Sequence, residues 1–275
     1  MVLRYTIVYD YFLKQRSFGM NLTEFSSNYV YSAFIIFCRV SCMILLTPGF
    51  GENNINSRIK ITFSFLITLI ILPIVNINNQ IIIPSEFLVL VLNVISELLL
   101  GIFFGLILRI ILSSVNILGY VISNTIGLSA ATLIDPTQDA QQGTIVGNFL
   151  TLLAIVLIFS FNLQHEVIQS IVLSYKNFKI GSFFEFYHDH TNTIVRVVND
   201  SWNIAIKMSM AFIIIGLVIN VVGGIISRIM PQIHVFFLII PLQTMVGFLI
   251  LAITVSSLMI WFIEHYKNYI DGVFG

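Results

Sequence analysis

The sequence predicts an all-α, polytopic integral membrane protein built from helical hairpins and from helices broken by proline and glycine. Of the 275 residues, 57% are hydrophobic and only 9% are charged, against about 25% charged residues in ordinary soluble domains. Mean hydropathy is +0.97 over the whole chain, so one water-soluble core could not hide all the apolar side chains. The hydrophobic residues also gather into long blocks separated by short polar stretches, which is the pattern of membrane-spanning helices.

Charge and motif content argue against several classes of function. Thirteen basic and thirteen acidic residues balance, so no overall field favours nucleic acid or an acidic substrate as a partner. The sequence also lacks a phosphate-binding glycine loop, a G-x-S-x-G nucleophile motif and an H-E-x-x-H zinc signature. We therefore expect no enzyme, no cofactor and no metal site. Cys38 and Cys42 lie four residues apart in an apolar block and are expected to be small buried hydrophobes without a disulfide.

The chain divides into three parts of unequal size. Residues 1–19 contain several charges and tyrosines, but not the apolar segment and small-residue cleavage site of a signal peptide. Met20 precedes the first hydrophobic block, and we expect translation to begin there. We thus expect 1–19 to be an extension, 20–267 to be a single membrane-embedded domain and 268–275 to be a C-terminal tail.

The first two hydrophobic blocks, residues 29–46 and 59–75, are each close to the roughly 20 residues that a spanning helix needs. Arg39 lies in the middle of the first block. An arginine at the centre of a membrane helix costs about 2.5–3.5 kcal/mol, so its side chain should face protein or water. Pro48 follows the first block and Pro73 lies near the end of the second, and both are expected to break their helices.

The third block, residues 87–112, is longer than one crossing requires and holds Glu97 and Arg109. These two side chains are about 18 Å apart along a helix and cannot pair with each other. Each therefore needs a partner from another helix, another chain or water. Gly101 and Gly105 form a small-xxx-small pair, which lets a neighbouring backbone approach closely.

The stretch 126–142 follows the third block and interrupts the apolar pattern with small and polar residues. Irregular backbone at membrane depth is tolerated only inside protein or beside a wet cavity. We therefore expect a loop or broken helix that faces an aqueous lumen; the alternative is a surface turn between two spanning helices. The candidate residues of this loop are Gly127, Leu128, Ser129, Ala130, Thr132, Asp135 and Pro136.

The second half of the chain contains three further apolar blocks, at 144–161, 202–226 and 235–263. The polar residues 174–200 between them are expected to form an extramembrane loop or hairpin. Two further prolines are expected to break helices, Pro231 and Pro241.

Charged residues within the apolar blocks are functional candidates by default, because burying them in a membrane is costly. They are Arg39, Glu97, Arg109, Lys207 and Arg228. Such residues either line a path for a solute or protons, or pair across an interface. Five charges and several broken helices favour an assembly whose subunits cover each other's polar faces.

Three stretches together resemble the R family of flagellar biosynthetic proteins, a membrane component of the type III export gate with counterparts in injectisomes. The central stretch 127–136 is similar to that family's G-L-S-x-A-x-x-x-D-P motif. The segments 97–105 and 220–232, the latter followed by Pro241-Leu242, also resemble family sequences. The similarity extends over about residues 20–267.

This resemblance implies a specific assembly in the bacterial inner membrane, at the flagellar basal body. Family members combine with the P and Q components, alongside the B component, into a helical cone whose pore conducts unfolded flagellar proteins. By similarity, 126–142 would be a plug loop, and neighbouring subunits would supply partners for the buried charges. Lipid would be a further partner, and nucleic acid would not.

Two other functions are alternatives. A secondary transporter or small-solute channel would use Glu97 and Arg109 to bind a solute or protons at broken helices. An intramembrane transferase would use Asp135 and Asp139 with magnesium.

Overall fold

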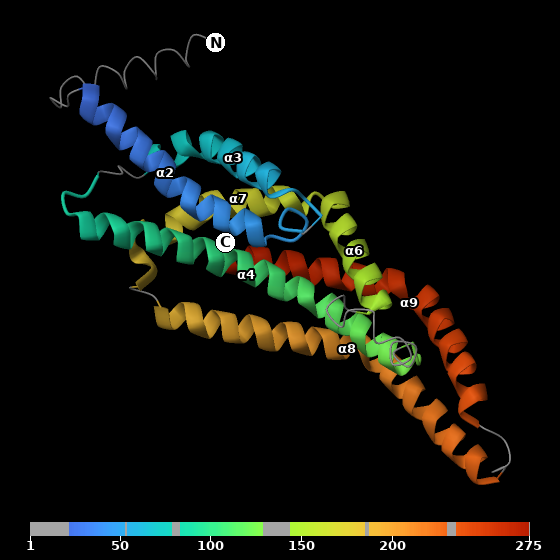
Figure 1. Ribbon diagram of the computed structural model, residues 1–275. Helices are drawn as coiled ribbons and strands as arrows, with labels where there is room; N and C mark the ends of the chain where they lie inside the picture. Colours follow the sequence, from blue (N-terminus) through green and yellow to red (C-terminus); the bar gives the residue numbers. More distant parts are fainter. Residues whose placement is uncertain are drawn as a thin grey trace.

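A computed structural model describes residues 22–52, 54–78, 83–128, 144–184, 187–229 and 235–274. These residues form helices and short connections, with no strand among them (Figure 1). The helices are α2 (Leu22–Leu46), α3 (Ser57–Asn78), α4 (Phe87–Thr125), α6 (Ile145–Ser160), α7 (Leu163–Asn177), the 3₁₀ helix η1 (Ser182–Phe184), α8 (Tyr187–Ile229) and α9 (Val235–Phe274). Within the described ranges, five helices are long and apolar enough to cross a membrane, and α6 with α7 would be a sixth span bent by 73°. The predicted all-α, polytopic membrane fold is confirmed.

Helix α4 is the central element of the fold. It has 39 residues, which corresponds to a length of about 58 Å, and it contacts α2, α6, α8 and α9. Figure 1 shows it running between α2 on one side and α8 on the other. Its fully buried side chains include Phe104, Leu108, Ile111, Val115 and Leu118. The hydrophobic core is therefore built around one face of this helix.

The two glycines predicted to allow a close helix approach lie where α4 meets α2. A Cβ atom at Gly101 would overlap the carbonyl oxygen of Arg39 and lie 2.8 Å from Cys42 Cβ. A Cβ atom at Gly105 would lie 2.6 Å from Leu46 Cβ. Both positions therefore require glycine for the observed packing.

Prolines affect the helices less than predicted. Helix α2 ends at Leu46, and Pro48 lies in the turn that follows. Helix α3, however, continues through Pro73, and α9 continues through Pro241, so the prediction that these two prolines break their helices is wrong. Each proline removes one backbone hydrogen bond, whereas leaving the helical state within an apolar segment would expose many more. Pro231 lies outside the described residues.

Residues 174–200, which the sequence predicts to form an extramembrane loop or hairpin, are mostly helical, and their position outside the membrane stays a prediction. Helix α7 continues to Asn177 and α8 already begins at Tyr187, so the connection is limited to 178–186. The first turns of α8 bury Val197, Ser201 and Ile204, which share one helical face. This buried face lies among polar residues in the sequence, and its packing stabilises a helix there.

Helices α8 and α9 are consecutive, lie in contact, and are both unusually long. With 43 and 40 residues, they measure about 65 Å and 60 Å, against about 30 Å for the hydrocarbon layer of a bilayer. The last turns of α8 and the first turns of α9 extend past the other helices (Figure 1). Unless strongly tilted, both helices therefore continue beyond the hydrocarbon layer. Helix α9 also continues to Phe274, through the region where the sequence predicted a C-terminal tail.

Candidate functional site

The most deeply buried charges form an ion pair between α2 and α4. Arg39 Nε lies 2.7 Å from Glu97 Oε2, and both side chains are 0% exposed. Arg39 Nη2 donates a second hydrogen bond to Glu97 Oε1 at 2.9 Å. This two-pronged geometry is the strong form of an arginine–carboxylate interaction.

The same pair fixes α7 and the turn after it. Arg39 Nη1 donates to Ser174 Oγ at 3.1 Å, and Nη2 also donates to the Phe178 carbonyl at 3.3 Å. The guanidinium lies 3.9 Å from the centre of the Tyr175 ring, which is a cation–π contact. The backbone N–H of Gly181 donates to Glu97 Oε1 at 3.4 Å. Arg39 and Glu97 therefore pair with each other at an interface between helices of this chain. The partners that the resemblance implied from neighbouring subunits are not needed for these two residues.

The three other candidate charges lie at the surface of the chain. Arg109 on α4 and both Lys207 and Arg228 on α8 are exposed. Within the described residues, none of the three belongs to an ion pair. Their placement at interfaces between subunits or between helices stays a prediction.

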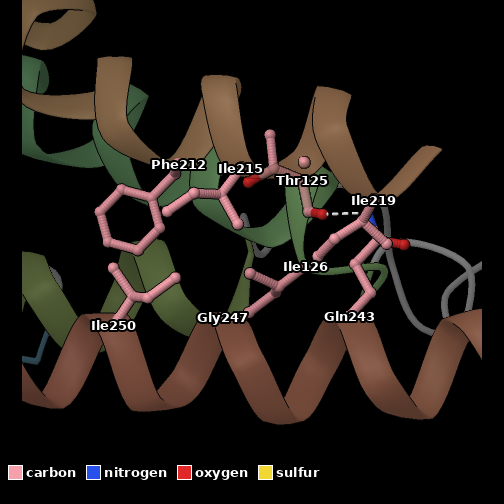
Figure 2. A pocket seen from close by; sticks show the side chains of 9 residues that line it. Thr125, Ile126, Phe212, Ile215, Ile219, Gln243, Gly247 and Ile250 are labelled. Atoms are coloured by element: carbon pink, nitrogen blue, oxygen red, sulfur yellow. Dashed lines mark hydrogen bonds between the residues drawn. The ribbon is translucent and has the colours of Figure 1, made fainter. Parts of the chain in front are cut away.

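A second cluster of contacts surrounds the end of α4, where the predicted central loop begins. The last carbonyl groups of any helix lack partners within that helix. Here Gln243 of α9 donates from Nε2 to the Thr125 carbonyl, and Thr244 Oγ1 donates to the Ile126 carbonyl at 2.9 Å. Figure 2 shows the amide of Gln243 reaching across to Thr125. Side chains of α9 therefore cap the C-terminus of α4.

Glycines allow α8 and α9 to enclose this end of α4. A Cβ atom at Gly247 of α9 would lie 2.7 Å from Ile126 Cβ, and one at Gly216 of α8 would lie 3.2 Å from Thr125 Cβ. A small pocket remains between the three helices and is lined mainly by aliphatic side chains such as Ile215 and Ile250 (Figure 2). Its small polar part is provided by Gln243 and Thr125.

The chain returns to α4 at the start of α6. Thr144 caps α6, because its Oγ1 accepts a hydrogen bond from the Gly147 N–H at 3.1 Å. Gly119 of α4 packs directly on the backbone of Gly147, and a Cβ atom at Gly119 would lie 2.6 Å from Gly147 N. Gly119 and Thr125 are about 9 Å apart along α4. Both ends of the segment 129–143 are thus attached to the same part of one helix.

We call these two sets of contacts the loop base: Thr125–Leu128 with Gln243 and Thr244 at one end, and Gly119 with Thr144–Gly147 at the other. Of the candidate loop residues, Gly127 and Leu128 belong to it. Gly127 has φ +80°, a conformation that favours glycine, and Leu128 packs against the core. The remaining candidates lie outside the described residues: Ser129, Ala130, Thr132, Asp135 and Pro136.

Sequence reasoning missed the residues that hold the loop base. Gln243 and Thr244 are consecutive polar residues within an apolar block, and this was the available signal. Gly119, Gly147 and Gly247 carried no signal beyond being small residues in helices.

The sequence matches the bacterial export proteins, family 1, over residues 30–269. The chain belongs to this family. Flagellar biosynthetic protein FliR of Caulobacter vibrioides is 32% identical over 242 residues, which are 88% of this chain and 95% of that protein. FliR of Bacillus subtilis is 26% identical, with coverage of 82% and 86%. FliR of Escherichia coli is 25% identical, with coverage of 82% and 85%.

Membership of the bacterial export proteins confirms the resemblance found in the sequence. Together with its apolar helices, it identifies this chain as a membrane component of the flagellar type III protein export apparatus. The protein is accordingly a multi-pass protein of the bacterial inner membrane, at the flagellar basal body.

Proposed function

We propose that this export protein forms part of the wall of a pore that conducts unfolded flagellar proteins, and that it catalyses no reaction itself. We further propose that it assembles with the P and Q components, and that it lies beside the B component. The observation that carries this proposal is the loop base. Two anchors about 9 Å apart on α4 hold both ends of 129–143, as a segment placed across a passage would require.

Residues 126–142 would act as the plug of this pore. Hydrogen bonds from Gln243 and Thr244 fix the start of the segment, and the Gly119–Gly147 contact fixes its end. A segment attached at both ends can be displaced by a passing chain and return without leaving the site. This behaviour suits a barrier that must open for protein and otherwise retain ions.

The exposed apolar surface of the α8–α9 hairpin indicates that other subunits pack against it. Large side chains such as Leu217, Val221 and Ile225 are exposed on α8, and α8 is about twice as long as the hydrocarbon layer is thick. Apolar surface that continues beyond the lipid needs protein to cover it. The P and Q components would provide this cover.

Shortening the plug tests its role. Deletion of 130–139 is expected to leave the complex assembled and to raise ion conductance in planar bilayers, because the barrier is removed while both anchors remain. Gln243→Leu should raise the conductance less, since it removes one hydrogen bond of the loop base. Gln169→Leu is the matched control, because Gln169 is exposed on α7. If the shortened complex forms normally and conducts no more ions than the unaltered one, residues 126–142 are not the plug.

Co-purification tests the assembly. When this chain is expressed with the P and Q components, affinity purification through it is expected to yield one complex that contains all three, as identified by mass spectrometry. Expressed alone, it should be unstable in detergent because its apolar surface lacks cover. A monodisperse, well-folded monomer that binds neither component would contradict the proposed assembly.

A further inference from the structure

The exposed face of α4 changes character along the helix. Near its start, exposed side chains are large and apolar, with Phe87 80% and Leu88 68% exposed. Towards its end, every exposed side chain from 109 onwards can form hydrogen bonds. These residues are Arg109, Ser113, Asn116, Tyr120 and Asn124, which we call the polar stripe.

The polar stripe is a continuous feature of one helical face. Its residues follow each other at intervals of three or four, so they lie above one another along the helix. The opposite side of the same segment buries Ile111, Val115 and Leu118 completely. This packing fixes the rotation of α4, so the stripe faces away from the hydrophobic core that the described residues form.

Lipid is an unfavourable surrounding for this stripe. From Arg109 to Asn124 it extends for about 22 Å, which is most of the roughly 30 Å hydrocarbon layer. An amide or hydroxyl placed in an apolar medium without a partner costs about 2–7 kcal/mol, and a central arginine costs about 2.5–3.5 kcal/mol even on insertion scales. Ser113 reduces its cost by donating to the Ile110 carbonyl at 2.6 Å. In lipid, the amides of Asn116 and Asn124 and the guanidinium of Arg109 would each still carry this free-energy cost.

We infer that the polar stripe lines the water-filled passage and contacts the unfolded polypeptide during export. This inference rests on the proposed function and adds the surface that the substrate meets. The stripe ends at Asn124, beside the anchor that Gln243 forms with Thr125, so it leads to the point where the segment 129–143 departs.

The chemistry of the stripe suits an extended polypeptide of any sequence. Asparagine amides donate and accept hydrogen bonds, as do hydroxyl groups, and the backbone of an unfolded chain offers both kinds of group at nearly every residue. Arg109 is the one charged residue of the stripe, so the face does not select strongly for one sign of side-chain charge. Weak, exchangeable contacts of this kind allow a chain to move along the surface.

Cysteine labelling in the assembled complex tests the inference. Asn116→Cys and Asn124→Cys are introduced where Cys38 and Cys42 have been replaced by alanine and residues 130–139 have been removed, so that reagent can enter. Leu66→Cys on α3 and Leu249→Cys on α9 are controls, because these leucines are 53% and 57% exposed but lie on apolar surfaces. A charged, membrane-impermeant thiol reagent should label the stripe cysteines at least about tenfold faster, because a thiol needs water to ionise. An export substrate fused to a stable folded domain, which stalls in the passage, should then slow this labelling several-fold.

Two results would overturn the inference. Stripe cysteines that react as slowly as those at Leu66 and Leu249 would place the stripe against lipid or a partner subunit. Fast labelling that the stalled substrate does not slow would place it in water away from the exported chain. Either result would leave the proposed function intact if the complex without residues 130–139 still conducts ions. If that complex does not conduct ions, the result counts against the proposed function itself.

Discussion

Arg39→Leu is expected to lower the stability of the protein by about 3–5 kcal/mol, because it leaves the buried carboxylate of Glu97 without its counter-charge. The substitution also removes the hydrogen bonds to Ser174 and to the Phe178 carbonyl, so α7 should loosen from α2 and α4. Thermal unfolding of the purified export complex in detergent measures the effect. A dye that reacts with thiols reports it, because Cys38 is buried in the folded chain.

Two further variants separate the ion pair from general damage. The double variant Arg39→Leu with Glu97→Leu should lose less stability than the sum of the losses of the two single variants, because no unpaired charge remains buried. Arg109→Leu is the matched control, since that arginine is exposed on the same helix as Glu97, and it should leave the unfolding midpoint unchanged. Equal midpoints for Arg39→Leu and Arg109→Leu would show that the pair does not stabilise the fold.

Gly119→Ala is expected to destabilise the contact between α4 and α6 by about 1–3 kcal/mol, a typical cost of overpacking. The added Cβ atom would overlap the Gly147 backbone, which is less able to move than a side chain. The two helices would have to separate, and the second anchor of the loop base would shift with them. We therefore expect a lower unfolding midpoint together with a higher ion leak through the assembled complex.

Gly272→Ala provides the opposite case within a helix of the same chain. A Cβ atom at Gly272 of α9 meets nothing within 4 Å, and alanine is favoured over glycine in a helix by about 0.5–1 kcal/mol. This variant should be as stable as the unaltered protein or slightly more so, with no added leak. If the two glycine variants unfolded at the same temperature, the close packing of Gly119 on Gly147 would be wrong.

Local sequence features predicted some structural details and failed for others. Gly101 and Gly105 lie at a close helix contact, as their spacing indicated. Pro73 and Pro241 do not end their helices, because the surrounding apolar residues favour a helical backbone more than one proline opposes it. The polar stretch at the start of α8 becomes helical because its residues Val197, Ser201 and Ile204 form a buried face.

The class of the fold, the membrane location and the family follow from the sequence alone, because hydrophobic content and spaced motifs are properties of consecutive residues. The partners of individual polar groups depend on the tertiary structure. Arg39 and Glu97 are 58 residues apart and form a bidentate pair, and Gln243 caps a carbonyl 118 residues before it. Such contacts depend on which helix faces meet when the chain packs. For the same reason, only the packing of α4 distinguishes Glu97, which is buried against Arg39, from Arg109, which is exposed on the polar stripe.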